Sequence, residues 1–585
     1  KESALIMRKQ TKLVAVLSTA ALLAIGASMT SFAAQGWAEE DGTWVYYNKD
    51  GDKVTNEWKK SGDNWYYLDD NGEMAVDQLI EDDDNYYYVD VNGTMVTNQW
   101  VAIENEDAGE EDEPDNYWYY FQSNGKAFKR SDNASNDAIN AKVINGKKYA
   151  FDTDGKMLYG WVKDGERQTD DDAWKDAEYY FGDENDGAMS VGWRLISITD
   201  EDAESAEPGD EFWDEDQDRW FWFKSSGKKQ INKDGKTING KKYGFDEYGR
   251  MIASWYAADV QRTSEKATTP LATQAQVQGV ASYSEGFMYF SDPESGARYT
   301  KGWFKVVPGY YLHESKYNDG DEYWYYADGN GNIYSNVIKT IKGKKYAFDE
   351  YGRMISGLVF LEMVNAETSD EIAMKYADDA DAYAGNLAAS EQNGKTGPYD
   401  TEENFDDFVA DHADEIADGL IRCYYFGASD DGSMKTGKQT IEIDGESFKF
   451  NFKTGSNLKG SGVNGFDDDK LYTAGKLVKA DKDDKYTIYE VTESTTSAGT
   501  TSIKVESMDV AKFLKLTGVT KNKHDDKKEE QTWTIDTDVV YSGGKTYYLI
   551  NSSGTVTKNK TGAKDGDDYK FNVDNKKITK VTLED

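Results

Sequence analysis

The sequence predicts a mainly β protein, an elongated solenoid of β-hairpins, and three observations support this prediction. An apolar register repeats every 21 residues, at Trp37, Trp58, Leu79 and Trp100. Tyrosine and glycine keep the same period, at Tyr46, Tyr67 and Tyr88 and at Gly51, Gly72 and Gly93. Aromatic residues make up 14% of the chain, so rings rather than aliphatic side chains must supply most of the packing. A unit this short cannot bury its apolar face alone and must stack on copies of itself.

Each unit combines an aromatic run, a polar turn that ends in glycine, and a second short apolar segment. In residues 64–74 the run begins at Trp65, the turn ends at Gly72, and Met74 follows. Aromatic residues fit a half-buried strand, and an Asn-Gly or Asp-Gly pair supplies the positive φ that a tight hairpin turn needs. We therefore expect a hairpin that joins the aromatic run to the segment after the glycine. The turn recurs at Asp50-Gly51, Asn92-Gly93, Asn124-Gly125 and Asp154-Gly155.

A longer repeat follows, in which a module of three hairpins occurs three times. The first hairpin type places a glycine seven residues after Trp118, Trp220 and Trp324. The second type carries an Ile-x-Gly-Lys-Lys-Tyr segment that starts at Ile144, Ile238 and Ile341. The third type places a glycine seven residues after Tyr180, Tyr289 and Tyr425. The array is therefore expected to continue well beyond its 21-residue section.

Composition divides the chain into four expected regions. These are a signal peptide (1–33), 21-residue hairpin repeats (34–116), the triplicated module (117–438) and a β-rich C-terminal region with degenerate repeats (439–585). An insertion at 359–420 has apolar residues spaced among Ala, Asp and Glu, which predicts amphipathic helices. They include Phe360, Met363, Ile372, Met374, Phe405, Phe408, Val409, Ile416 and Leu420. The insertion is either a binding surface carried by the scaffold or an acidic cap on it.

The first 33 residues have the pattern of a secretory signal. Arg8, Lys9 and Lys12 precede an apolar stretch at 13–27, and Ser31-Phe32-Ala33 forms a cleavage site with small residues. The stretch is short for a bilayer span. We therefore expect a secreted protein that begins at Ala34 and has no membrane span after cleavage.

Charge and the reactive residue types exclude several functions. The formal net charge is −42, which argues against a nucleic-acid partner because phosphate binding needs clustered Lys and Arg. The one cysteine, Cys423, cannot form an internal disulfide and is expected to be a packed thiol. The three histidines are far apart in the sequence and have no neighbouring residues that would complete a zinc site or a Ser-His triad; they are His313, His412 and His524. No catalytic residue, metal site or cofactor is predicted.

The chain resembles the cell-wall-binding repeats of Gram-positive surface proteins, which include choline-binding repeats. The resemblance lies in Gly36-Trp37 before Trp44-Val45-Tyr46-Tyr47, and in Trp58 before Trp65-Tyr66-Tyr67. The Ile-Asn-Gly-Lys-Lys-Tyr segments resemble related repeats of glucan-binding proteins and of the receptor-binding ends of clostridial toxins. The resemblance covers about residues 36–437. It implies a left-handed solenoid with shallow aromatic pockets between successive hairpins.

The same resemblance implies where a ligand binds. In choline-binding members the pockets are aromatic cages, and ring faces hold a quaternary ammonium by cation–π attraction. A sugar uses such rings differently, by stacking its apolar face on them while nearby polar groups bind its hydroxyls. Packing between hairpins is the alternative role for each ring. The expected ligand-binding residues are Trp37, Trp44, Trp58, Trp65, Tyr67, Trp100, Trp118 and Tyr120.

From these features we expect a secreted, noncatalytic cell-surface protein that attaches noncovalently to the bacterial cell wall. Its expected partners are choline-bearing teichoic acid or wall polysaccharide, bound through the aromatic pockets. Two alternatives stay open. One is a glycan-binding adhesin of the glucan-binding or toxin-repeat type, and the other is a wall hydrolase with its active site in 359–420 or 439–545.

Overall fold

The computed structural model describes residues 35–110, 112–132, 134, 139–199, 217–257, 287–309, 312, 314–366, 370–376, 401–480, 483–522, 531–566 and 568–584. The expected signal peptide lies outside these residues. The chain divides into two compact units. Unit 1 comprises Lys1–Ala253 with Asp292–Ala297, and unit 2 comprises Ser254–Ser291 with Arg298–Asp585.

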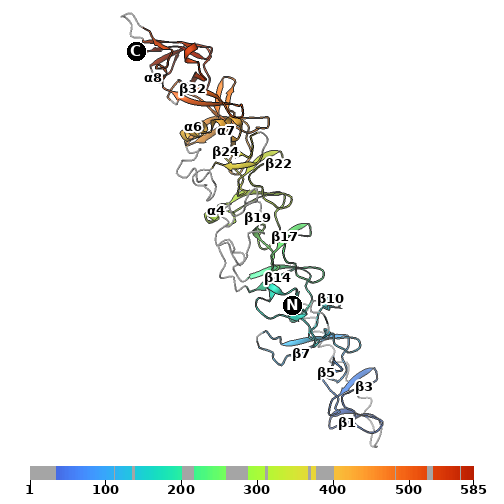
Figure 1. Cartoon of the computed structure of the whole chain (residues 1–585). Coiled ribbons are helices and arrows are strands. Elements are labelled where there is room, and N and C mark those ends of the chain that lie inside the picture. Colours follow the sequence, from blue (N-terminus) through green and yellow to red (C-terminus); the bar gives the residue numbers. More distant parts are fainter. Residues whose placement is uncertain are drawn as a thin grey trace. The chain divides into compact units, whose positions relative to one another are not determined.

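Unit 1 is a succession of antiparallel hairpins that follow one another in chain order (Figure 1). A short helix, α3 (Ala173–Asp176), lies between β12 and β13. The hairpins are β1 (Gly36–Glu40) with β2 (Thr43–Tyr47), β3 (Glu57–Ser61) with β4 (Asn64–Leu68), β5 (Gln78–Asp82) with β6 (Asn85–Val89), β7 (Gln99–Glu104) with β8 (Asn116–Phe121), β9 (Lys142–Ile144) with β10 (Lys147–Tyr149), β11 (Gly160–Lys163) with β12 (Glu166–Arg167) and β13 (Tyr179–Phe181), β14 (Gly192–Ile198) with β15 (Gln217–Phe223), and β16 (Lys233–Ile238) with β17 (Lys241–Phe245).

The hairpins turn at a different place from the one expected. The aromatic strand β4 pairs with β3, which precedes it, so that Trp58 lies opposite Tyr67 and the tip is at Gly62. The turn that ends at Gly72 instead connects one hairpin to the next. After this turn, Met74 forms a single bridge to Leu68. The expected pairing across Gly72 was therefore wrong, because both flanking turns have sequences that favour reversal of the chain.

The connecting turns share one hydrogen-bond pattern. The Asp69 carboxylate accepts hydrogen bonds from the backbone N–H groups of Asn71 and Glu73, at 2.9 and 2.8 Å. Side chains of Asp and Asn stabilise turns in this way because they reach their own backbone a few residues on. The corresponding residues Asn48, Asp90, Asp152, Asp246, Asp328, Asp349 and Asn551 make the same pair of bonds.

The connecting turns also stack on one another through their glycines. A Cβ atom at Gly125 would lie 2.4 Å from Met95 Sδ, so only glycine fits there. In general, the side chain two residues after one turn glycine packs against the glycine of the next turn. We call this series of contacts the spine. Besides Met95 with Gly125, it joins Lys53 to Gly72, Met74 to Gly93, Met157 to Gly187, Met189 to Gly227, Lys229 to Gly249 and Met251 to Gly296 in unit 1, and Arg298 to Gly331, Ile333 to Gly352, Met354 to Gly432 and Met434 to Gly460 in unit 2.

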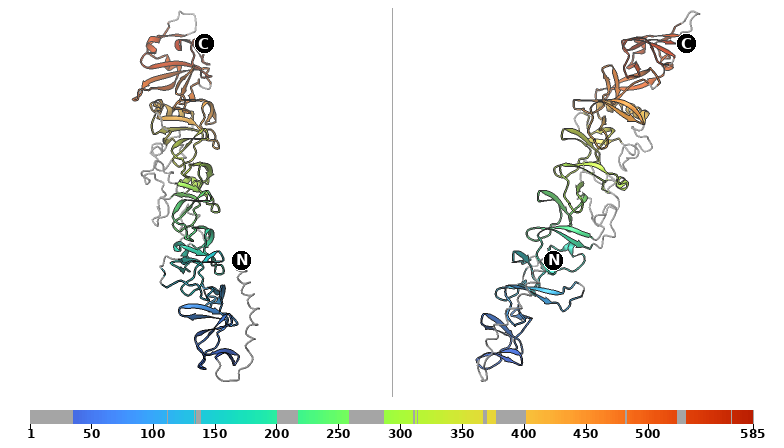
Figure 2. Two further views of the ribbon diagram at one scale, coloured as in Figure 1. Left: turned by 90° about the vertical axis from the view of Figure 1, so that its right-hand side faces the viewer. Right: turned by 180° about the vertical axis from the view of Figure 1, so that it is seen from behind.

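Unit 2 begins with the same kind of hairpin, and two further views show the hairpins again following in sequence order (Figure 2). They are β18 (Ser254–Ala257) with β19 (Phe287–Phe290), β20 (Gly302–Val306) with β21 (Tyr323–Ala327), β22 (Val337–Ile341) with β23 (Lys344–Phe348), and β24 (Leu358–Met363) with β25 (Ile372–Lys375) and β26 (Ile421–Tyr425). The helix α4 (Glu314–Asp319) precedes β21. The three hairpin types therefore recur three times, as the sequence predicts.

The insertion at 359–420 is partly helical, as expected, but some residues assigned to helices lie in strands. The helices α6 (Glu402–Asp411) and α7 (Ala413–Asp418) contain the expected apolar residues Phe405, Phe408, Val409 and Ile416. The expected helical residues Phe360, Met363, Ile372 and Met374 lie instead in β24 and β25. This correction has a physical reason: β24 is the first strand of a third-type hairpin, and Phe360 pairs with Cys423 on β26.

The C-terminal region is β-rich, as expected. One sheet contains β27 (Gly437–Ile443), β28 (Glu446–Phe452), β31 (Lys476–Leu477), β30 (Lys470–Thr473) and β29 (Gly465–Asp467), in that order. A second contains β33 (Thr501–Met508), β32 (Tyr486–Thr495) and β36 (Lys545–Asn551). A third contains β34 (Val519–Lys521), β35 (Thr532–Ile535), β39 (Lys577–Leu583), β38 (Tyr569–Asp574) and β37 (Lys560–Lys564). Two short helices, α8 (Val510–Phe513) and α9 (Thr537–Val540), complete the region.

The boundaries expected at 116/117 and 438/439 fall inside strands. Asn116 and Gly437 are the first residues of β8 and β27. A degenerate repeat does follow the second boundary, because Gly554 packs against Leu477 as turn glycines do in the spine. Whether the four regions are separate folding domains stays a prediction.

Candidate functional site

Hairpins in the 21-residue section carry aromatic side chains on both faces: on β4, Tyr67 lies on the face of Trp58, whereas Tyr66 lies on the other face and contacts Trp37 of the preceding hairpin. Trp58 on β3 lies opposite Tyr67 on β4, and the alternation of strand side chains places Trp65 on the same face. The rings of Trp58 and Tyr67 contact each other edge to face, with centroids 5.1 Å apart. Tyr87 of the next hairpin contacts the same Trp58 ring, also at 5.1 Å. Three rings from two hairpins thus form one cluster.

A carboxylate lies beside this cluster. The indole N–H of Trp58 donates a hydrogen bond to Asp82 Oδ2 at 3.2 Å. Burial, followed by the charge of Asp82, raises the pKa of both Tyr67 and Tyr87, so both phenols stay neutral. Neutral ring faces beside a negative charge form an environment that favours an organic cation.

The same arrangement recurs along both units. A tryptophan on the first strand contacts an aromatic ring on its partner strand and another on the following hairpin. All these pairs have centroids 4.8 to 5.4 Å apart. They are Trp37 with Tyr46 and Tyr66, Trp100 with Tyr120 and Tyr149, Trp161 with Tyr180 and Phe221, Trp193 with Trp222 and Tyr243, Trp255 with Tyr289 and Tyr325, and Trp303 with Tyr326 and Tyr346.

The structure brings together some of the expected site residues. Trp58 and Tyr67 share a cluster, whereas Trp37 belongs to the neighbouring one. Trp44 and Trp65 make no ring contact with another described aromatic residue, and Trp65 is 41% exposed. Ring contacts therefore join Trp58 and Tyr67 but not Trp44 or Trp65. The role of each residue in binding stays a prediction.

The expected residues Trp100, Trp118 and Tyr120 do gather in one place. They pack with Tyr149, Phe151 and Met157 in a single hydrophobic cluster. The acidic insertion between Trp100 and Trp118 does not separate them, because it lies between the paired strands β7 and β8. Of these three side chains Trp118 is buried, whereas Trp100 and Tyr120 are partly accessible.

Sequence reasoning missed two clusters that contain more than one tryptophan. Trp193 contacts Trp220 and Trp222, at 6.1 and 5.2 Å, and Trp303 contacts Trp324 at 6.3 Å. The inserted residues between the two strands hide these pairs in the sequence. The sequence signal for these clusters is a Gly-Trp dipeptide, at Gly192-Trp193 and Gly302-Trp303, which begins a strand whose partner comes only after an insertion.

Cys423 and His412 both lie among apolar or aromatic side chains. Cys423 is 2% exposed, and burial raises the pKa of its thiol well above the usual value. The ring of His412 contacts those of Phe408 and Tyr376 at tilted angles, whereas His313 and His524 lie outside the described residues. Within the described ranges, no group of three or more His, Cys, Asp or Glu residues is arranged to hold a metal ion. In the same part of the chain, no helix is long and apolar enough to cross a membrane.

Two family models match the N-terminal repeats. The choline-binding repeat model matches residues 34–78 and 54–100, and the putative cell wall binding repeat model matches residues 113–127. These segments contain the Trp37, Trp58 and Trp118 strands. Residues 34–100 and 113–127 are therefore cell-wall-binding repeats.

Relatives with similar repeats include enzymes and binding proteins. Glucosyltransferase-S of Streptococcus mutans is 25% identical over an alignment of 275 residues, which covers 42% of this chain but only 16% of that protein. Among solved structures, the modular autolysin LytC of Streptococcus pneumoniae is 18% identical, with 56% of this chain and 55% of that chain covered and a TM-score of 0.29. Choline binding protein F of the same organism is 19% identical, with 56% and 100% covered and a TM-score of 0.23.

Proposed function

We propose that this chain is a noncatalytic cell-surface protein that binds choline-bearing polymers of the cell wall through its interhairpin aromatic clusters. The observation that carries the proposal is the Trp58 cluster, in which Trp58 contacts the rings of Tyr67 and Tyr87 and donates a hydrogen bond to the Asp82 carboxylate. This cluster lies within the residues that match the choline-binding repeat model.

The chemistry of the cluster favours a quaternary ammonium. Such a group has no N–H to donate, so ring faces and a nearby negative charge are the interactions left to it. Trp58 and Tyr87 are only partly buried, so a small headgroup can reach the cluster from solvent. Attachment to the wall would then be noncovalent, and repeated clusters on one chain would add avidity. Secretion and the absence of catalysis belong to this proposal.

Calorimetry with the chain from Ala34 onward tests the ligand class. Choline is expected to bind saturably, whereas its uncharged isostere 3,3-dimethylbutan-1-ol is expected to bind far more weakly. Because several clusters are similar, Trp58→Ala is expected to lower the number of choline sites rather than abolish binding. Asp82→Asn is expected to weaken the same site while keeping its shape.

Trp65→Ala is the matched control. Trp65 lies on the same hairpin face but makes no described ring contact, so its loss is expected to leave the choline stoichiometry unchanged. Equal binding of choline and its neutral isostere, or loss of sites in Trp65→Ala but not in Trp58→Ala, would contradict the assignment of the Trp58 cluster.

Glucan binding is the second candidate, and the hairpin of β14 and β15 favours it. On one face of this hairpin, Leu195 lies opposite Trp220, and Trp193 lies opposite Trp222. The position of Leu195 carries Glu39, Lys60 or Glu81 in the first three hairpins. Leu195 is 47% exposed, so an apolar side chain lies open to solvent opposite Trp220, which suits the apolar face of a pyranose. Binding of α-glucan oligosaccharides without binding of choline would select this function.

A further inference from the structure

One aromatic cluster already contains a cation from the chain itself. Lys229 stands two residues after a turn glycine, the spine position that methionine occupies in most other repeats. Ala127 and Ile333 occupy this position in the first and third copies of the module. The side chain of Lys229 packs against Gly249 as a methionine would, but it ends in a charged group.

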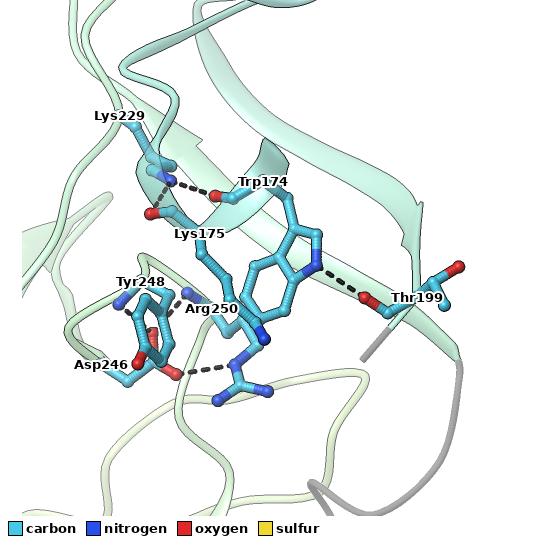
Figure 3. A network of polar contacts seen from close by, with 7 residues as sticks. All are labelled: Trp174, Lys175, Thr199, Lys229, Asp246, Tyr248 and Arg250. Atoms are coloured by element: carbon cyan, nitrogen blue, oxygen red, sulfur yellow. Dashed lines mark hydrogen bonds and ion pairs between the residues drawn. The ribbon is translucent and has the colours of Figure 1, made fainter. Parts of the chain in front are cut away.

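The ammonium group of Lys229 lies between rings and carbonyl oxygens. Its Nζ is 5.2 Å from the centroid of the Trp161 ring and 5.9 Å from that of Phe221. It donates hydrogen bonds to the backbone carbonyls of Trp174 and Lys175, the second at 3.2 Å (Figure 3). Lys229 is 6% exposed. These contacts are the ones expected for a bound primary ammonium, because it has both a positive charge and N–H groups to donate.

The two carbonyls are available because α3 is a single turn. The last carbonyls of a helix lack partners within the helix, and a lysine ammonium satisfies them well. Trp174 holds α3 in place: it is 1% exposed, and its indole N–H donates to the carbonyl of Thr199 at 2.7 Å. The inserted turn therefore supplies the two carbonyl oxygens that accept hydrogen bonds from Lys229, and the hairpins supply the Trp161 and Phe221 rings.

The surrounding charges leave Lys229 without an ion pair in the described chain. Asp246, Asp176 and Glu178 are the carboxylates that act on it from a distance. Asp246 is engaged by Arg250, whose Nε donates to its Oδ2 at 2.7 Å. The guanidinium of Arg250 in turn lies 4.9 Å from the centroid of the Trp174 ring (Figure 3). Burial lowers the pKa of Lys229 to about 8, so the amine is still mostly charged at neutral pH.

We infer that the cluster of Trp161 and Phe221, completed by the Trp174 and Lys175 carbonyls, is a primary-ammonium site that Lys229 of the chain itself occupies. External choline is excluded from it, because Lys229 fills the space and because a quaternary ammonium cannot bond the two carbonyls. The occupied site also locks the inserted turn at 164–178 onto the array. The inference does not depend on whether the other clusters bind choline.

Chemical rescue of Lys229→Ala tests this inference. The substitution removes three methylene groups and the ammonium, which are the atoms of n-propylammonium. In the full chain we expect Lys229→Ala to lower the midpoint of thermal unfolding and n-propylammonium chloride to raise it again, saturably. Choline chloride and sodium chloride at the same ionic strength are expected to give no such increase. A rescue that choline matches, or no rescue at all, would overturn the inference.

Lys229→Met is the matched control. It keeps the spine contact with Gly249 and fills the site with an apolar side chain, so n-propylammonium is expected to have no effect on its unfolding. Reductive methylation of the wild-type protein provides a second measurement that does not depend on a variant. Lys229 is expected to react far more slowly than Lys228, whose side chain is 41% exposed. Equal reaction of the two lysines would also overturn the inference.

Discussion

Gly125 and Gly146 have almost the same backbone conformation, with φ of +83° and +81°, but different surroundings. A Cβ atom at Gly125 meets Met95, whereas nothing lies within 4 Å of one at Gly146. Gly146→Ala is expected to cost about 1–2 kcal/mol, the usual cost of a left-handed conformation with a side chain. Gly125→Ala adds an overpacking cost of about 1–3 kcal/mol. Urea unfolding of the two variants measures the difference.

The double variant Gly125→Ala with Met95→Ala separates the two costs. Removal of the Met95 side chain makes room for the new methyl group, so the two substitutions are expected to destabilise less than the sum of their separate effects. Additive effects would show that Met95 does not pack against Gly125, and the spine would lose its physical basis.

Single residues were only partly predictable from the sequence. The period identified Trp58 and Tyr67 as recurring positions, but it did not show that they lie opposite each other on one hairpin. The sequence also predicted a ligand-binding role for Trp65, although the Trp65 side chain contacts no other described aromatic ring. Lys229 was not predicted at all, because its acceptors are backbone carbonyls in an insertion 54 and 55 residues away. No side-chain pattern records such a contact.

At the scale of elements, α6 depends on one buried lysine of a neighbouring sheet. Lys476 on β31 is 5% exposed at its side chain, and its Nζ lies 2.6 Å from Glu402 Oε1 and 2.8 Å from Asp406 Oδ2 on α6. Lys476→Met preserves the volume but removes the charge. The two carboxylates are about half exposed and can turn to water, so the expected loss is about 1–2 kcal/mol, below that for a fully buried pair.

Amide hydrogen exchange measures whether the loss of the Lys476 charge destabilises α6. Amides of α6 should exchange faster in Lys476→Met, whereas the hairpin of β22 and β23 should be unchanged. Lys438→Met, at an exposed position of β27, is the control. Unchanged protection of α6 would mean that apolar contacts such as Phe405 with Phe360, and not the ion pairs, hold the helix.

The type of each element was more predictable than its partner. The Asn239-Gly240 tip has the two positive φ values of a tight hairpin turn, and β16 and β17 pair across it as the sequence predicts. The aromatic strand β4, however, is flanked by a turn on each side, and its composition does not say which neighbour it joins. The segment around Phe360 was assigned to a helix because a short apolar run has no clear period. Its pairing with β26 depends on a strand some sixty residues later.

At the scale of the whole molecule, a formal charge of −42 is expected to assist the binding of cations. The charges that act over a distance are screened by salt, with a Debye length of about 10 Å at 0.1 M and about 3 Å at 1 M. Choline affinity is therefore expected to fall as sodium chloride is raised, while binding of 3,3-dimethylbutan-1-ol or of a neutral glucan is not. Titrations at several salt concentrations test this expectation. The same salt dependence for charged and neutral ligands would show that the acidic surface has no part in recognition.

The position of the added segments has a consequence for how such a protein can change over evolution. The long additions at 105–115, 164–178, 199–216, 258–286, 307–322 and 364–420 all lie between two strands that still pair with each other. The connecting turns keep the spine contact even where their length differs: the turn from Asp183 to Gly187 is one residue longer than the turn from Asp69 to Gly72, and both glycines meet the side chain from the turn before. New sequence can therefore enter at a hairpin end without altering the spacing of its neighbours. An epitope or enzyme inserted there by design is expected to be tolerated in the same way.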